Sequence, residues 1–75
     1  MPLKEAYKVR ERKKEILEIL KHADFLSLLN GLSTSEIADM LNCSISQAYY
    51  TLKLLEKEER VVKEKHKGKW LWKLK

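Results

Sequence analysis

The pattern of hydrophobic and polar positions predicts a long helix at the start of the chain, over about residues 4–22. Its apolar stripe comprises Ile16, Leu17, Ile19 and Leu20. Residues 10–15 are six consecutive charged residues, so the second half of this helix is expected to be packed and the first half solvated. The following segment, 23–31, is too apolar for a free loop and ends in an Asn-Gly stop signal, which predicts a short helical turn that closes over the core.

Two shorter helices are expected over about 34–41 and 45–57, because each is preceded by a capping box. In this motif a serine oxygen accepts a hydrogen bond from an amide three residues later, and the side chain there reaches back to the serine amide. The two pairs are Ser33 with Glu36 and Ser44 with Gln47. The expected apolar faces comprise Ile37, Ala38, Met40 and Leu41 in the first helix and Ala48, Leu52 and Leu55 in the second. Asn42 falls between them and tolerates the left-handed conformation that ends a helix, which predicts a sharp turn.

After these helices the spacing changes to the alternation of strands, which predicts a β-hairpin over about 60–74. The dipeptide Lys67-Gly68 supplies a two-residue turn, since glycine readily adopts positive φ. The pairs in this register are Val61 with Leu74, Lys63 with Trp72, and Lys65 with Trp70. Trp72 is thus expected on the inner face and in the core, whereas Trp70, nearer the tip, remains open between core and contact. Leu32 is a candidate for a very short third strand.

The composition sets broad limits on function. The chain has 75 residues, which allow one domain with a small core, so function is expected on the surface and not in an enzyme pocket. The 16 Lys and Arg against 11 Asp and Glu give a net charge of +5, which indicates nucleic acid or another anionic partner. The sequence has no apolar run of the roughly 20 residues that cross a bilayer, no signal-peptide segment and one cysteine. A cytoplasmic location without membrane contact is therefore expected.

The charge is unevenly distributed along the chain. The net charge is +3 over residues 1–22, −3 over residues 23–56 and +5 over residues 57–75. The two shorter helices are thus mildly acidic, while both flanks are basic. If the partner is a polyanion, the basic flanks would supply the long-range electrostatic attraction, and the two shorter helices would supply the surface that recognises its shape.

No pattern of catalytic or metal-binding residues stands out. His22 and His66 have no ligand companions at useful spacing, so neither a metal nor another cofactor is expected. No Ser/His/Asp or paired-carboxylate arrangement indicates catalysis. Cys43 is expected to be a buried and inert thiol.

The order of three helices and a basic hairpin, together with the run TSEIADMLNCSISQAYYTLKLLEKEERVV over residues 34–62, resembles the winged helix-turn-helix family. The resemblance covers residues 14–75, although Asn42 and Glu59 stand where this family often has glycine. It implies an α+β fold in which the 45–57 helix is the recognition helix and the hairpin is the wing. The size, the charge and the Trp-rich hairpin are also similar to those of small transcription regulators of archaeal plasmids and viruses.

In winged helix-turn-helix proteins the recognition helix enters the major groove and the wing lies along the phosphate backbone. The resemblance thus implies a transcription regulator that binds double-stranded DNA sequence-specifically, repressor-like and a candidate to control its own promoter. The implied DNA-binding residues are Ser44, Ser46, Gln47, Tyr49, Tyr50 and Lys53 on the helix and Lys63, Lys65, Lys67 and Lys69 on the wing. Gln47 has the donor and acceptor that suit adenine, and the lysines suit phosphate. One such domain covers little DNA, so two copies per site are expected.

Two other interpretations stay open, and a third is disfavoured. Winged helices also serve as protein-interaction modules, for which Ile45 and Leu54 are the candidate contacts. A non-specific basic DNA-coating protein would use the wing but not Gln47. The run from Leu71 to Leu74 also resembles the wing of domains that bind left-handed Z-form duplexes. That interpretation is disfavoured, because Tyr49 and Lys53 stand where those domains have asparagine and tyrosine.

Overall fold

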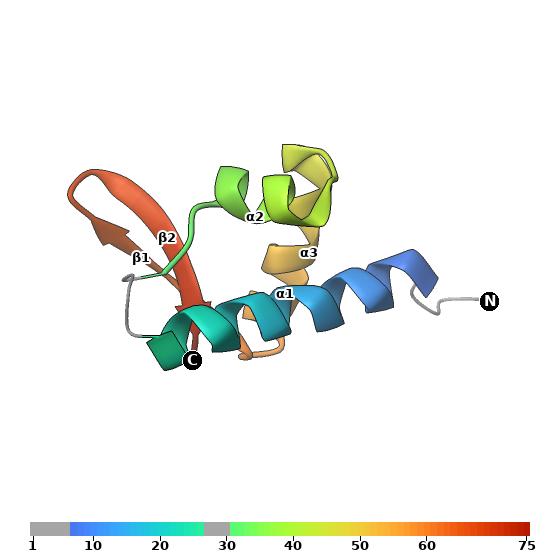
Figure 1. Ribbon diagram of the computed structural model, residues 1–75, viewed down its shortest axis with the longest axis horizontal. Helices are drawn as coiled ribbons and strands as arrows, with labels where there is room; N and C mark the ends of the chain where they lie inside the picture. Colours follow the sequence, from blue (N-terminus) through green and yellow to red (C-terminus); the bar gives the residue numbers. More distant parts are fainter. Residues whose placement is uncertain (1–6, 27–30) are drawn as a thin grey trace.

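Three helices and a two-stranded antiparallel hairpin follow one another along the chain (Figure 1). The computed structural model describes residues 7–26 and 31–75. The elements are α1 (Tyr7–Leu26), α2 (Thr34–Leu41), α3 (Ile45–Lys57), β1 (Val61–His66) and β2 (Lys69–Leu74). This order confirms the predicted α+β, winged-helix-like layout.

Helix α1 runs beyond its expected end near residue 22 and continues to Leu26. Ile16 and Leu20 are buried, and Ala23 packs half-buried against the same core, so the apolar stripe carries the helix through another turn. The helical turn predicted over 23–31 is therefore part of α1 as far as Leu26, and residues 27–30 lie outside the described part of the chain. In the charged first half, Lys13 is half-buried and pairs with Glu58, which joins α1 to the end of α3.

Both predicted capping boxes are present, and they place α2 and α3 in a fixed relation. Ser33 Oγ accepts a hydrogen bond from the Glu36 amide at 3.1 Å, and Glu36 Oε1 accepts one from the Ser33 amide at 2.8 Å. Asn42 ends α2 in the left-handed conformation, with φ 57° and ψ 46°. One expectation was wrong: Met40 does not join the apolar face of α2 but is 60% exposed. The helix packs on the core through Ile37 and Ala38, and this orientation leaves Met40 on the solvent side.

The hairpin has the predicted register. Val61 pairs with Leu74, Lys63 with Trp72 and Lys65 with Trp70. Both residues of the Lys67-Gly68 turn have positive φ, 52° and 84°, which matches the twist of a two-residue hairpin turn. Leu32 adds a single antiparallel bridge to Trp72, with backbone hydrogen bonds of 2.9 and 2.7 Å, so the expected third strand is reduced to one bridged residue beside a two-stranded sheet.

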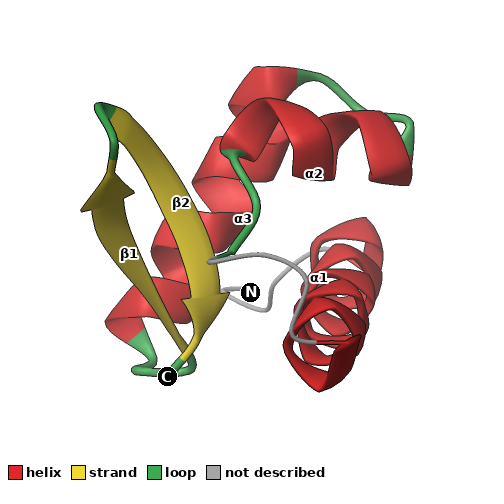
Figure 2. Ribbon diagram, turned by 60° about the vertical axis from the view of Figure 1, so that its left-hand side comes forward, coloured by secondary structure: helices red, strands yellow, loops and turns green. Residues whose placement is uncertain are grey.

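The core lies where the three helices meet the base of the hairpin. In Figure 2 the hairpin stands on one side of the helices, and α1 is seen nearly end-on on the other. The buried apolar residues are Ile16, Leu20, Leu32, Ile37, Ala38, Ala48, Leu52, Leu55, Val61 and Trp72. The Trp72 side chain is fully buried, as predicted, and its indole Nε1 donates a hydrogen bond to Thr34 Oγ1 at 2.8 Å. This bond ties the hairpin to the start of α2.

Candidate nucleic-acid interface

The solvent side of α3 carries the predicted DNA-binding residues of that helix. Its inner side is buried through Ala48, Thr51, Leu52 and Leu55, and the Thr51 hydroxyl donates to the Gln47 carbonyl at 2.9 Å. Packing of this face leaves the remaining sides of the helix to solvent. The predicted residues that lie exposed there are Ser44, Ser46, Gln47, Tyr49, Tyr50 and Lys53.

Gln47 has a structural role that narrows what it can offer to DNA. Ser44 Oγ accepts from the Gln47 amide, and Gln47 Oε1 accepts from the Ser44 amide, both at 3.1 Å. The two-bond contact with adenine predicted from the sequence needs the same oxygen as acceptor, together with Nε2 as donor. Because the cap holds Oε1 and does not involve Nε2, a single contact through the Nε2 donor requires the least rearrangement.

An aromatic–lysine cluster joins the recognition helix to the hairpin. We define it as Tyr49 and Lys53 of α3 with Lys63, Trp70 and Trp72 of the hairpin. The Tyr49 and Trp72 rings meet edge-on, with centroids 6.3 Å apart and planes at 70°. Aromatic pairs in this geometry contribute beyond the area they bury. The contact therefore holds the hairpin at a set distance from α3.

Lys63 is at the centre of this cluster. Its Nζ lies 5.1 Å from the Trp70 ring centroid, 5.4 Å from that of Trp72 and 5.9 Å from that of Tyr49. An ammonium within about 6 Å of an aromatic face is attracted by the negative face of the ring. Three rings thus localise one positive charge between α3 and the hairpin.

Lys53 approaches the same tyrosine from the helix side, with its Nζ 5.9 Å from the ring centroid. It also donates a hydrogen bond to Glu56 Oε1 at 2.8 Å. This bond, together with the negative charge of Glu56, raises the pKa of Lys53, so its ammonium stays protonated. The neighbouring carboxylate also offsets part of its charge.

The other wing lysines lie toward the hairpin tip. Lys65 is exposed, with its Nζ 5.7 Å from the Trp70 ring centroid, and Lys67 and Lys69 are exposed beside the turn. In the described part of the chain no carboxylate pairs with these three, whereas Lys73 pairs with Glu64 at 3.1 Å. Their charge is therefore available to an anionic partner.

The structure brings some predicted site residues together and leaves others apart. Lys53 and Lys63 both lie over the Tyr49 ring in the cluster. Ser46 and Tyr50 are exposed elsewhere on α3, and the remaining lysines lie toward the hairpin tip. Trp70, which is 53% exposed between Lys63 and Lys65, was not among the predicted residues. The hairpin register already paired Trp70 with Lys65, so the signal for it was present in the sequence.

Among residues 7–26 and 31–75, no three His, Cys, Asp or Glu side chains are grouped so that they could hold a metal ion. The helices in the same residues include none with the length and apolar character to cross a membrane. Cys43, expected to be buried, is half-buried and packs against the core.

A family described as FaeA-like protein matches residues 12–75, which is most of the chain and includes all of the helices and strands except the start of α1. A comparison with curated proteins gives no match. The similarity to regulators of archaeal plasmids and viruses stays a prediction.

Proposed function

The chain belongs to the FaeA-like protein family of winged-helix-like regulators, and on this basis we propose that it regulates transcription by binding a specific site in double-stranded DNA. In this proposal α3 enters the major groove and the hairpin lies along the phosphate backbone. The protein acts in the cytoplasm through binding alone, without catalysis or a cofactor.

The observation that carries the proposal is the aromatic–lysine cluster. A recognition helix and a wing bind one duplex at a lower entropic cost when their relative position is fixed, because each mobile element loses conformational freedom on binding. The 6.3 Å contact between Tyr49 and Trp72 and the position of Lys63 over three rings provide this connection. The Lys63 charge lies at the junction of α3 and the hairpin. In the proposed complex, the phosphate backbone of the DNA would pass this junction between the part bound by α3 and the part bound by the hairpin.

The dimensions of α3 suit the major groove. Its 13 residues give a length of about 20 Å at 1.5 Å per residue, and the groove of B-form DNA, about 12 Å wide, admits one helix. Ser46, Tyr50 and the Nε2 of Gln47 are the groups of α3 that we assign to base edges. We assign Lys53 and Lys63, with the tip residues Lys65, Lys67 and Lys69, to phosphates.

Occupancy of a specific site is proposed to need two copies of the chain. A single module of this kind buries roughly 600–1,000 Å² of protein surface on DNA, which is small for tight and specific binding. Two copies on neighbouring half-sites double the contact and set a spacing of about one helical turn. Binding of this kind within a promoter, including that of its own gene, excludes polymerase and gives repression.

Selection from a random pool of duplexes at fixed salt tests the proposal. We expect the enriched duplex to bind at least about 10³-fold more tightly than a shuffled duplex of equal length, as is usual for specific DNA-binding proteins. Fluorescence anisotropy with both duplexes measures this ratio. A ratio near one would identify a non-specific coating protein, and the absence of binding to any duplex would favour the protein-interaction module, for which Ile45, 57% exposed, is the first candidate contact.

A further inference from the structure

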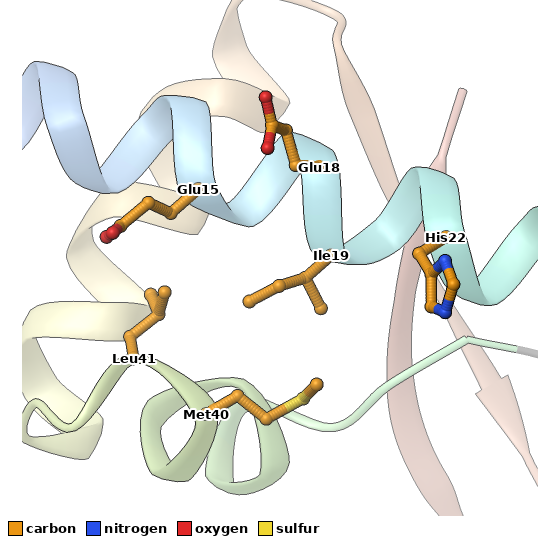
Figure 3. A pocket seen from close by; sticks show the side chains of 6 residues that line it. All are labelled: Glu15, Glu18, Ile19, His22, Met40 and Leu41. Carbon is orange, nitrogen blue, oxygen red and sulfur yellow. The ribbon is translucent and has the colours of Figure 1, made fainter.

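A second surface lies on α1 and α2 and uses none of the residues assigned to DNA. It is a groove of about 360 Å³ lined by Glu15, Glu18, Ile19, His22, Met40 and Leu41. In Figure 3, Ile19 points from α1 toward Met40 and Leu41 of α2, Glu15 extends on the Leu41 side, and Glu18 points away from α2. We name this surface the α1–α2 groove.

The floor of the groove is apolar and accessible. Ile19 and Leu41 are half-buried against the core, and the Met40 side chain is 60% exposed. Burial of apolar surface is favourable at roughly 25 cal/mol per Å², so an exposed methionine beside two aliphatic side chains is a site at which a partner gains by contact. Methionine is also flexible and polarizable, so it adapts to the shape of a partner side chain.

The charge of the groove is opposite to that of the protein. The net charge of the chain is +5, yet the groove lining includes two glutamates and neither lysine nor arginine. Because negative side chains repel phosphate, the groove does not suit DNA and instead suits a cationic partner.

We propose that the α1–α2 groove docks a basic amphipathic helix of another protein. Two helices with a shallow groove between them accept a third helix by interdigitation of side chains, with apolar anchors at the spacing i, i+3 and i+4. Apolar anchors of the partner would pack on Ile19, Met40 and Leu41, and its Lys or Arg side chains would pair with Glu15 and Glu18. Since α3 and the hairpin contribute nothing to the groove, docking there leaves them free.

A synthetic peptide serves as the probe. Peptides shorter than about 15 residues are marginal helices in water, so we choose one of that length made of leucine and lysine at helical spacing. Control peptides have glutamate in place of lysine, or the same residues in scrambled order. Amide chemical shifts of the isotopically labelled protein, titrated without DNA, report where each peptide binds, so the result does not depend on the proposed DNA-binding function.

We expect the leucine–lysine peptide to shift the amides around Ile19, Met40 and Leu41 and the two controls to leave them unchanged. Glu15→Lys should lower the affinity for this peptide about fivefold, because it replaces a favourable charge contact with a repulsive one. Met40→Ser should weaken it about tenfold through lost apolar contact. Neither change threatens the fold, because both side chains are exposed.

Glu64→Lys is the matched control for net charge, since it makes the same substitution in the hairpin, away from the groove. Equal weakening by Glu64→Lys and Glu15→Lys would show diffuse attraction and overturn the proposal. An unchanged affinity for Met40→Ser would do the same. Groove amides that shift with protein concentration alone would identify a second copy as the occupant, and those that shift on adding duplex DNA would identify nucleic acid; either result refutes the proposal.

Discussion

Replacing Lys63 with alanine should weaken both the folded state and DNA binding, and the two effects can be separated. Lys63 is half-buried, and its Nζ lies within 5.9 Å of the ring centroids of Tyr49, Trp70 and Trp72. Its charge thus connects α3 with the hairpin in the free protein. The same charge is assigned to a phosphate in the proposed complex.

The magnitude follows from these contacts. A cation–π contact contributes about 0.5–1 kcal/mol at an exposed site and about 2 kcal/mol when desolvated. The three rings share one ammonium, so their contributions do not add, and we expect Lys63→Ala to lower the free energy of unfolding by about 1–2 kcal/mol. For a domain of this size each kcal/mol corresponds to a Tm change of about 4–8 °C.

DNA binding supplies the second measurement. Each phosphate neutralised by a lysine contributes about 0.9 to the slope of log K against log salt concentration. Lys63→Ala should therefore lower this slope by about 0.9. Lys69→Ala is the control, because Lys69 is exposed at the hairpin tip, so it should lower the slope equally and leave the Tm unchanged.

The comparison of these variants can refute the reasoning. Equal Tm values for Lys63→Ala and Lys69→Ala would show that the aromatic–lysine cluster does not stabilise the fold. An unchanged salt slope for Lys63→Ala would remove this residue from the DNA interface. Lys63→Met retains the apolar stem without the charge, so it measures how much of any stability loss comes from packing.

Three further changes test the backbone and the recognition helix. Gly31→Ala should cost roughly 3 kcal/mol or more in urea unfolding, because its φ is 126° and a Cβ there would lie 2.5 Å from the Trp72 carbonyl oxygen. Glu59→Gly should stabilise by about 0.5–1 kcal/mol in the same assay, because Glu59 has a φ of 62°, which glycine adopts without strain. Gln47→Ala should lower affinity for the selected duplex by about 0.5–1.5 kcal/mol, as expected for one hydrogen bond through Nε2, and affinity for shuffled duplex far less, as measured by anisotropy.

Matched variants guard each of these results. Gly68→Ala is the comparison for Gly31→Ala, since Gly68 also has positive φ but nothing within 4 Å of its Cβ position, so it should cost less. Glu59→Gly also removes the exposed ion pair with Lys75 at 3.0 Å, so Lys75→Ala is its control. A larger loss of stability in Glu59→Gly than in Lys75→Ala would show that strain at Glu59 is not what limits the fold. Glu36→Ala removes the corresponding capping bond of α2, away from the interface, so an equal loss of specific affinity there would assign the Gln47 effect to helix stability and not to a base contact.

Local interactions explain why much of the fold could be predicted from the sequence. The capping boxes at Ser33 and Ser44 act within one helical turn, so each helix start is encoded by residues three positions apart. Asn42 adopts the left-handed conformation, which a short polar side chain such as that of asparagine tolerates better than most others. The hairpin register follows from the two-residue turn, because the period of two in a strand allows only one pairing that buries Val61 and Trp72.

Features that depend on distant partners could not be predicted in the same way. The end of α1 was placed too early, since the packing of Ala23 against the other elements extends the helix. The exposure of Met40 depends on the orientation of α2 about its own axis in the packed structure, whereas helical spacing alone placed it on the apolar face. The same orientation puts Met40 in the lining of the α1–α2 groove.

The candidate site divides along the same line. The sequence by itself determined which residues of α3 and the hairpin face outward, because the apolar periods of a helix and a strand specify their inner sides. Only the tertiary structure decided which of them meet. Tyr49 and Lys63 are far apart in the chain and reach each other only because α3 and the hairpin pack on a shared core around Trp72. The physical reason is that contacts between elements depend on how whole faces pack and not on local spacing.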